Sequence, residues 1–158
     1  MRINRRIALT GSALLAALAL AAPAAAARTT AGVDDFRSRA TAICMVEMGA
    51  VNRQISAVNT AKTTAQSVKS MGNLAKALRR LSTQLSALAA PAKVAASNEW
   101  RELTGLTRVA ADDYEAVAGE VKRGANAVGI RAYLARAKGE VALAKIAAKK
   151  LGLTACSR

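Results

Sequence analysis

The sequence predicts an all-α protein, and the expected architecture is an antiparallel, up-down-up-down four-helix bundle closed by one disulfide bond. Three observations support this fold class. Alanine, the strongest helix former, recurs along the whole chain, whereas aromatic residues make up only 3% of it. Apolar residues follow helical spacing in four long stretches, and alternating β-branched runs are absent. Short segments containing proline, glycine or asparagine separate the stretches, so neighbouring helices are expected to pack side by side.

The first helix is expected over residues 33–58. Its acids Asp34 and Asp35 would lie in the opening turn, where the helix dipole favours negative charge, and Asn59 marks the exit. One face is apolar and is predicted to be buried, with Cys44 beside it: Val33, Phe36, Ala40, Ile43, Val51, Ile55 and Val58.

The second helix, expected over residues 63–89, has the strongest periodicity in the chain. Its apolar residues alternate between spacings of three and four, which is typical of a buried helical seam: Met71, Leu74, Leu78, Leu81, Leu85 and Leu88. No acid occurs in residues 61–90. A positively charged surface is predicted on the side facing away from the seam, formed by Lys69, Lys76, Arg79 and Arg80.

The third helix follows Pro91 and is expected over residues 93–123. It holds most of the acids of the chain, among them the pairs Glu99–Glu102 and Asp112–Asp113. Its predicted inner face consists of Ala96, Trp100, Leu103, Ala110, Val117 and Val121, with Tyr114 on or beside it.

The fourth helix is expected over residues 127–151, after a tight turn in which Gly124 ends one helix and Asn126 caps the next. Gly152 and Leu153 fit a Schellman ending, with Leu153 folding back onto the last turn. The predicted inner side consists of Ile130, Leu134, Ala137, Val141, Ala144, Ala148 and Leu151. In this bundle two basic helices flank the acidic third helix, so interhelical ion pairs are an alternative use for much of the charge.

Residues 1–27 are predicted to be a secretory signal peptide. Arg2, Arg5 and Arg6 form a positive start, an apolar stretch follows, and small residues precede a cleavage site near Ala26 or Ala27. The apolar stretch is shorter than a membrane-spanning helix requires, so an uncleaved membrane anchor is not expected. We also expect no transmembrane span in the chain that remains after the signal peptide is removed. Residues 28–158 would then form a single helical-bundle domain that is secreted or extracytoplasmic.

Export places the two cysteines of the chain, Cys44 and Cys156, in an oxidising compartment, where a disulfide bond between them is the expected state. This bond would tie the C-terminal tail back onto the first helix. A structural zinc site is a poorer explanation, because the chain contains no histidine and two thiolates are too few ligands.

The formal net charge is +14, and it is still +11 without the three arginines of the signal peptide. Such a charge predicts attraction to polyanions, such as anionic envelope polymers or lipid head groups, and export makes nucleic acid an unexpected partner. The alternative is that the charge serves only solubility. The predicted surface combines the four cations of the second helix with three near the end of the fourth: Lys145, Lys149 and Lys150.

Several segments resemble a group of small secreted helical proteins of high-GC bacteria. The matching segments are FRSRATAIC at 36–44, LAAPA at 88–92, RGAN at 123–126 and AKKLGLTAC at 148–156. The resemblance covers nearly all of the expected mature chain. It implies a helical bundle with a disulfide bond from the first helix to the C-terminus. It implies no particular activity, and no functional residue is carried over from it.

No catalytic or metal site is expected. Without histidine the chain lacks the commonest general base, and adjacent acids on a helix point about 100° apart. We therefore expect a non-enzymatic protein without a cofactor, namely an envelope-associated binding or structural module. The alternative is a carrier of a small hydrophobic ligand in the bundle core. Because the chain has no histidine, axial ligation of haem would fall to methionine or tyrosine. The candidates are Met45, Met48, Met71, Tyr114 and Tyr133.

Overall fold

The computed structural model describes residues 22–158, and their side chains from residue 32 onward. Residues 1–21, which make up most of the expected signal peptide, lie outside the described part. The described chain contains no strand and folds into these elements in order: α1 Ala22–Asn59, α2 Thr64–Ser86, α3 Ala92–Ala95, α4 Asn98–Lys122, α5 Ala127–Lys150 and the 3₁₀ turn η1 Thr154–Ser157. The predicted all-α fold class is confirmed.

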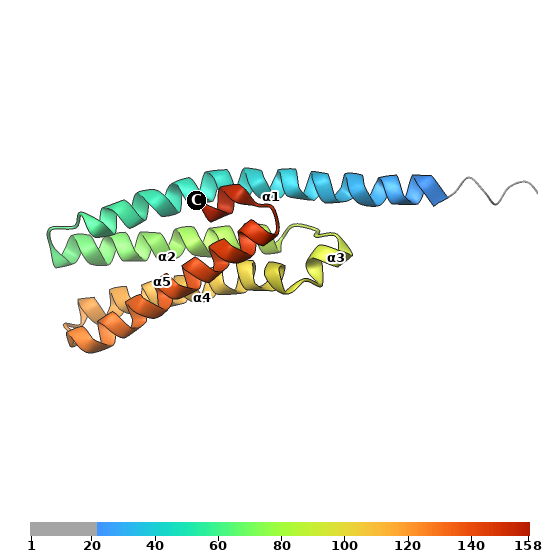
Figure 1. The fold of residues 1–158 in the computed structure, drawn as a ribbon. Helices are drawn as coiled ribbons and strands as arrows, with labels where there is room; N and C mark the ends of the chain where they lie inside the picture. Colours follow the sequence, from blue (N-terminus) through green and yellow to red (C-terminus); the bar gives the residue numbers. More distant parts are fainter. Residues whose placement is uncertain (1–21) are drawn as a thin grey trace, which may run out of the picture.

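The four long helices pack against one another in chain order. Helix α2 contacts α1 and α4, and α4 contacts α5. Figure 1 shows that successive long helices lie side by side and are joined at alternate ends of the molecule. In the described chain the backbones of α1 and α5 do not come close to each other, whereas η1 contacts both helices. The C-terminal turn therefore fills the place where the first and last helices would meet.

The main hydrophobic core draws residues from all four long helices and from η1, and a smaller buried cluster consists of Met71, Val117 and Ala118. The predicted seam of α2 is confirmed, since its leucines from Leu74 to Leu85 are buried and Leu88 is partly buried. At one end, Phe36 of α1 packs edge-on against Trp100 of α4, with ring centroids 5.1 Å apart. This edge-to-face geometry is favourable for an aromatic pair, and the contact links α1 to α4.

The predicted turn chemistry is also confirmed. The Asn126 side chain accepts hydrogen bonds from the backbone N–H groups of Val128 and Gly129, both at 3.1 Å, and so caps α5. Helices α4 and α5 both end at a glycine with positive φ, Gly124 at 71° and Gly152 at 76°. In the second case the N–H of Leu153 bonds to the Ala148 carbonyl at 2.9 Å, which completes a Schellman ending and buries Leu153.

The third expected helix is interrupted, which corrects the prediction of a continuous helix over residues 93–123. A short helix, α3, ends before Ser97, whose hydroxyl then accepts a hydrogen bond from the Trp100 N–H at 3.2 Å and caps α4. A serine in extended backbone conformation is a strong N-cap, so starting α4 at Ser97 is favoured over continuing the helix from α3. Ala96 therefore lies exposed in the connection, and its predicted place on the inner face is wrong.

The start of the first helix also differs from the prediction. Helix α1 begins at Ala22, so Asp34 and Asp35 lie in its interior rather than in its first turn. Asp35 instead lies one turn before Arg39, with 3.8 Å between their charged atoms. Cys44 lies within the buried face itself.

Candidate anionic-surface site

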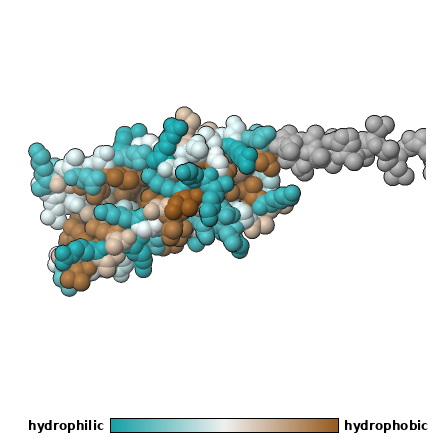
Figure 2. All heavy atoms as spheres, in the orientation of Figure 1, coloured by the Kyte–Doolittle hydropathy of each residue, from teal (hydrophilic) through white to brown (hydrophobic). Residues whose placement is uncertain are grey.

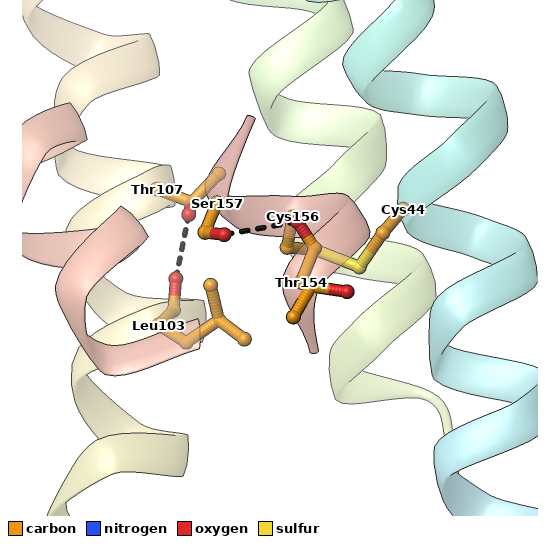
Figure 3. The surroundings of a disulfide bond; sticks show 6 residues. All are labelled: Cys44, Leu103, Thr107, Thr154, Cys156 and Ser157. Carbon is orange, nitrogen blue, oxygen red and sulfur yellow. Dashed lines mark hydrogen bonds between the residues drawn. A yellow bond between two sulfur atoms is a disulfide. The ribbon is translucent and has the colours of Figure 1, made fainter. Parts of the chain in front are cut away.

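The disulfide bond anchors the C-terminal turn against α1. Cys44 and Cys156 are bonded, their Cα atoms are 4.8 Å apart, and both are buried. Figure 3 shows the disulfide bond linking α1 to η1. The same view shows α4, where the Thr107 hydroxyl donates a hydrogen bond to the Leu103 carbonyl. The predicted pairing is thus confirmed, and it holds the end of α5 in a defined place.

The two arginines of the predicted α2 surface take part in interhelical ion pairs. Arg79 Nη2 lies 2.7 Å from both Asp112 Oδ1 and Glu115 Oε2 of α4. Hydrogen bonds to these carboxylates, that to Asp112 first, raise the pKa of Arg79 above its usual value. Arg80 lies on the other side of α2, where its Nε donates to Glu47 Oε2 of α1 at 3.3 Å.

Glu47 is a residue that the sequence analysis missed. It is buried, and its second carboxylate oxygen accepts a hydrogen bond from Gln84 Nε2 of α2 at 3.1 Å. A buried carboxylate needs such partners because an unpaired buried charge is costly. Arg80 and Gln84, one turn apart on α2, supply them, so this side of the basic surface stabilises the contact with α1.

The lysines of the predicted surface have a different environment. Lys69 and Lys76 are exposed on α2, and Lys149 and Lys150 are exposed in the last turn of α5. Lys145 is only partly exposed and lines a small interior cavity. A shallow, open depression joins part of the α2 surface, lined by Lys76, Arg79, Arg80, Thr83 and Gln84.

Arginines and lysines thus have different roles in the ion pairs of the described structure. Every ion pair in the described residues is made by an arginine, and no described lysine takes part in one: the arginines are Arg39, Arg79, Arg80, Arg123 and Arg136. The planar guanidinium group suits this role, because it holds carboxylates in a fixed geometry, often at two points. The unpaired positive charge of the described residues therefore lies on the lysines and on exposed arginines such as Arg37, Arg53 and Arg108.

A second ionic group, which the sequence analysis did not identify, joins α4 to α5. The guanidinium of Arg136 donates from Nε and Nη2 to both oxygens of Asp113, which is buried. Glu140 lies one turn further along α5, with its Oε1 3.9 Å from Arg136 Nε. Its Oε2 is buried and has no hydrogen-bond partner. Burial, and next the negative charge of Asp113, raise the pKa of Glu140, while Arg136 opposes the shift.

The interior offers little space for a ligand. The cavity between the helices has a volume of about 10 Å³, which is room for about one water molecule. It is lined mainly by apolar side chains of the four long helices: Met48, Leu78, Leu81, Leu103, Val141 and Ala144. Of the methionines that could ligate haem, Met48 and Met71 are buried in different core clusters, whereas Met45 is exposed.

The described residues contain neither a metal-binding cluster nor a helix able to span a bilayer. Within residues 22–158, no group of three or more acidic or cysteine side chains lies close enough together to hold a metal ion. No helix in this described part is both long enough and apolar enough to cross a membrane. Comparison with protein-family models, with curated proteins and with solved structures found no match to this chain.

Proposed function

We propose that this protein is a non-enzymatic, extracytoplasmic helical module that binds anionic surfaces of the cell envelope. The observation that carries the proposal is that the described lysines take no part in the ion pairs of the fold. Ion pairs within the fold use the arginines, whereas Lys69, Lys76, Lys149 and Lys150 lie exposed without an acidic partner. Exposed cations that serve no contact within the fold are available for lipid head groups or anionic envelope polymers.

The charge alone also fits a protein that is merely soluble, and the two roles differ in an observable way. A binding surface requires lysines at particular places, whereas solubility depends only on the net charge. Binding to a polyanion also weakens with salt, because mobile ions screen exposed charges over about 10 Å at 0.1 M salt. Both properties can be tested on the same preparation.

The test uses the processed, disulfide-bonded protein recovered from an exporting host, sedimented with isolated cell envelopes at low and high salt. Neutralising four surface lysines, K69Q, K76Q, K149Q and K150Q, should lower the affinity about a hundredfold or more at low salt, because each lysine near an anionic surface contributes about 1 kcal/mol. The arginines stay unchanged, since their loss would disturb the fold.

The control variant removes the same charge elsewhere, at exposed Lys62, Lys93, Arg108 and Lys122, none of which forms an ion pair in the described structure. It should bind more tightly than the four-lysine variant. Equal loss in both would show that only net charge matters, and absence of binding at low salt by the unaltered protein would contradict the proposed function.

The carrier of a small hydrophobic ligand remains the second expectation from the sequence, but the small interior cavity does not favour it. A ligand larger than a water molecule would require the helices to separate. Absorbance and extracted-lipid measurements on the protein purified from its host would detect such a ligand.

A further inference from the structure

We propose that the outer face of α5 is a membrane-contact face that lies in the interface of an anionic lipid bilayer. This inference rests on the proposed function and names its partner as a lipid surface rather than a soluble polymer. It is drawn from apolar side chains that the bundle leaves exposed beside lysines.

Helix α5 exposes large apolar side chains that the fold does not cover, among them Leu143 and Ile146. Leu143 and Ile146 are each 53% exposed, although the helix has a buried face of its own, built on Ala137, Ala144 and Ala148. At about 100° per residue, Ile146 lies opposite that buried face, and Leu143 lies at its border, one turn before buried Ala147. Figure 2 shows hydrophobic side chains at the molecular surface along the course of α5, with hydrophilic ones beside them.

Small residues extend this apolar strip along the helix. Ala135, Gly139 and Ala142 are exposed and project from the same side as Ile146. Gly139 has no other residue close to the position where a β-carbon would stand. The strip is therefore flat and open, and no part of the described protein covers it.

Positive charges border the strip, and no exposed acid interrupts it. Lys138 and Lys149 lie along one edge, and Lys150 lies one turn beyond Ile146, in a direction between those of Ile146 and Leu143, all three exposed. The single acid of α5, Glu140, points inward, with only 13% of its side chain exposed. An apolar strip accompanied by lysines and free of exposed acids is the pattern of a helix that lies in the plane of a membrane interface, where the lysines reach anionic head groups.

The other exposed faces lack this combination. On α2 the exposed Lys76 lies beside polar Thr83 and Gln84, and none of the large exposed apolar side chains belongs to α2. On α1, Met45 and Val46 are each 69% exposed, but this helix also exposes the acids Asp34 and Asp35. Among the described helices, α5 combines exposed large apolar side chains with exposed lysines and exposes no acid, so a soluble polyanion would suit α2, whereas a bilayer suits α5.

A second copy of the chain is the main competing occupant of an apolar helix face. Packing α5 against α5 of another copy would bring the lysines of both helices together. Like charges at such close range are unfavourable, and the face carries no exposed acid to offset them. Charge complementarity therefore favours an anionic bilayer.

The first experiment places a fluorophore on the strip. The only native tryptophan, Trp100, is buried in the core, so its emission is expected to change little on binding. In the processed, disulfide-bonded protein, I146W keeps the strip apolar. Its emission should shift to the blue with phosphatidylglycerol-containing vesicles, and brominated acyl chains should quench it. Absence of quenching while the protein still sediments with these vesicles would overturn the inference and leave the proposed function standing.

The second experiment separates the apolar from the ionic contribution. The variant L143S/I146S keeps every charge and alters only exposed positions, so far-UV circular dichroism should be unchanged. Its affinity for anionic vesicles should fall about tenfold, while binding to soluble polyphosphate should stay the same. Equal affinity of this variant and the unaltered protein for vesicles would overturn the inference.

The matched control is K69Q/K76Q, which removes two charges from α2 and leaves α5 intact. It should lower vesicle affinity less than K149Q/K150Q does, for which we expect a loss of about 25-fold at low salt. The reverse order would assign the contact to α2 and overturn the inference. Sedimentation without vesicles identifies the other occupant: a dimer that L143S/I146S dissociates would assign the strip to a second copy.

Discussion

Removing the disulfide bond should destabilise the protein more than the loss of any single hydrogen bond or helix cap. Cys44 and Cys156 are 112 residues apart in sequence, so the bond closes nearly the whole described bundle into one loop. For a loop of this length, the chain-entropy model predicts that the bond raises the free energy of unfolding by about 5 kcal/mol. The variant C44A/C156A should lose about that amount, which is a large share of the stability of an ordinary domain.

Urea unfolding followed by Trp100 fluorescence measures this loss. The tryptophan is a suitable probe because it is buried against Phe36 of α1 and will become exposed when the helices separate. The oxidised protein should also show a smaller dependence of its unfolding free energy on urea, since its cross-linked unfolded state exposes less surface. Comparison with the reduced unaltered protein separates the cross-link from the small cavities that alanine leaves.

A loss below about 1 kcal/mol would refute the entropic reasoning, because it would mean that the tail is held chiefly by packing. The variant L153A tests that alternative directly. Leu153 is completely buried beneath η1, and its truncation in the oxidised protein should cost about 2–5 kcal/mol. Both sulfur atoms belong to buried residues, so reduction by dithiothreitol should be slow in the native protein and should accelerate as η1 opens.

Two further predictions concern the contacts of α5. Burial raises the pKa of Glu140 in the folded state, so ionisation of its carboxyl group opposes folding. This penalty is absent below the pKa of the unfolded state and grows as the pH rises through the pKa of the folded state. E140Q, which can donate to Asp113, should therefore stabilise the protein by about 1 kcal/mol at neutral pH and by less near pH 4, and urea unfolding that shows no gain at neutral pH would contradict this. N126A removes the cap of α5 and should cost about 1 kcal/mol in thermal or urea unfolding, whereas N126D should cost little; equal losses would show that the cap contributes nothing.

The elements that could be predicted from the sequence are those set by local chemistry. The seam from Met71 to Leu85, the cap at Asn126 and the Schellman ending at Gly152 each depend on a few neighbouring residues, and the structure contains all three. Ser97 is a local signal too, but the alanine-rich segment around it is equally compatible with a continuous helix. Its capping bond to Trp100 shows how one side chain decides between two helical arrangements.

The pairing of charges could not be predicted in the same way. Arg79 and Lys76 both carry positive charge on the same side of α2, yet only Arg79 reaches the acids of α4. That outcome depends on the rotation and height of one helix against another, which spacing along a single helix does not determine. The same holds for Asp113 and Arg136, which lie 23 residues apart and meet because α4 and α5 pack closely.

The identity of each cation nevertheless contains information that net charge omits. Arginine holds carboxylates through a fork of donors and loses less freedom for each bond, so it suits contacts between helices. Lysine is a flexible point charge that is strongly hydrated, so it is more easily left at a surface. In this chain seven of the ten acids lie in ion pairs with arginine, whereas no described lysine takes part in an ion pair. For a basic helical bundle, the positions of the lysines relative to exposed apolar residues are therefore a better guide to a binding surface than the total charge, and in this protein they single out α5.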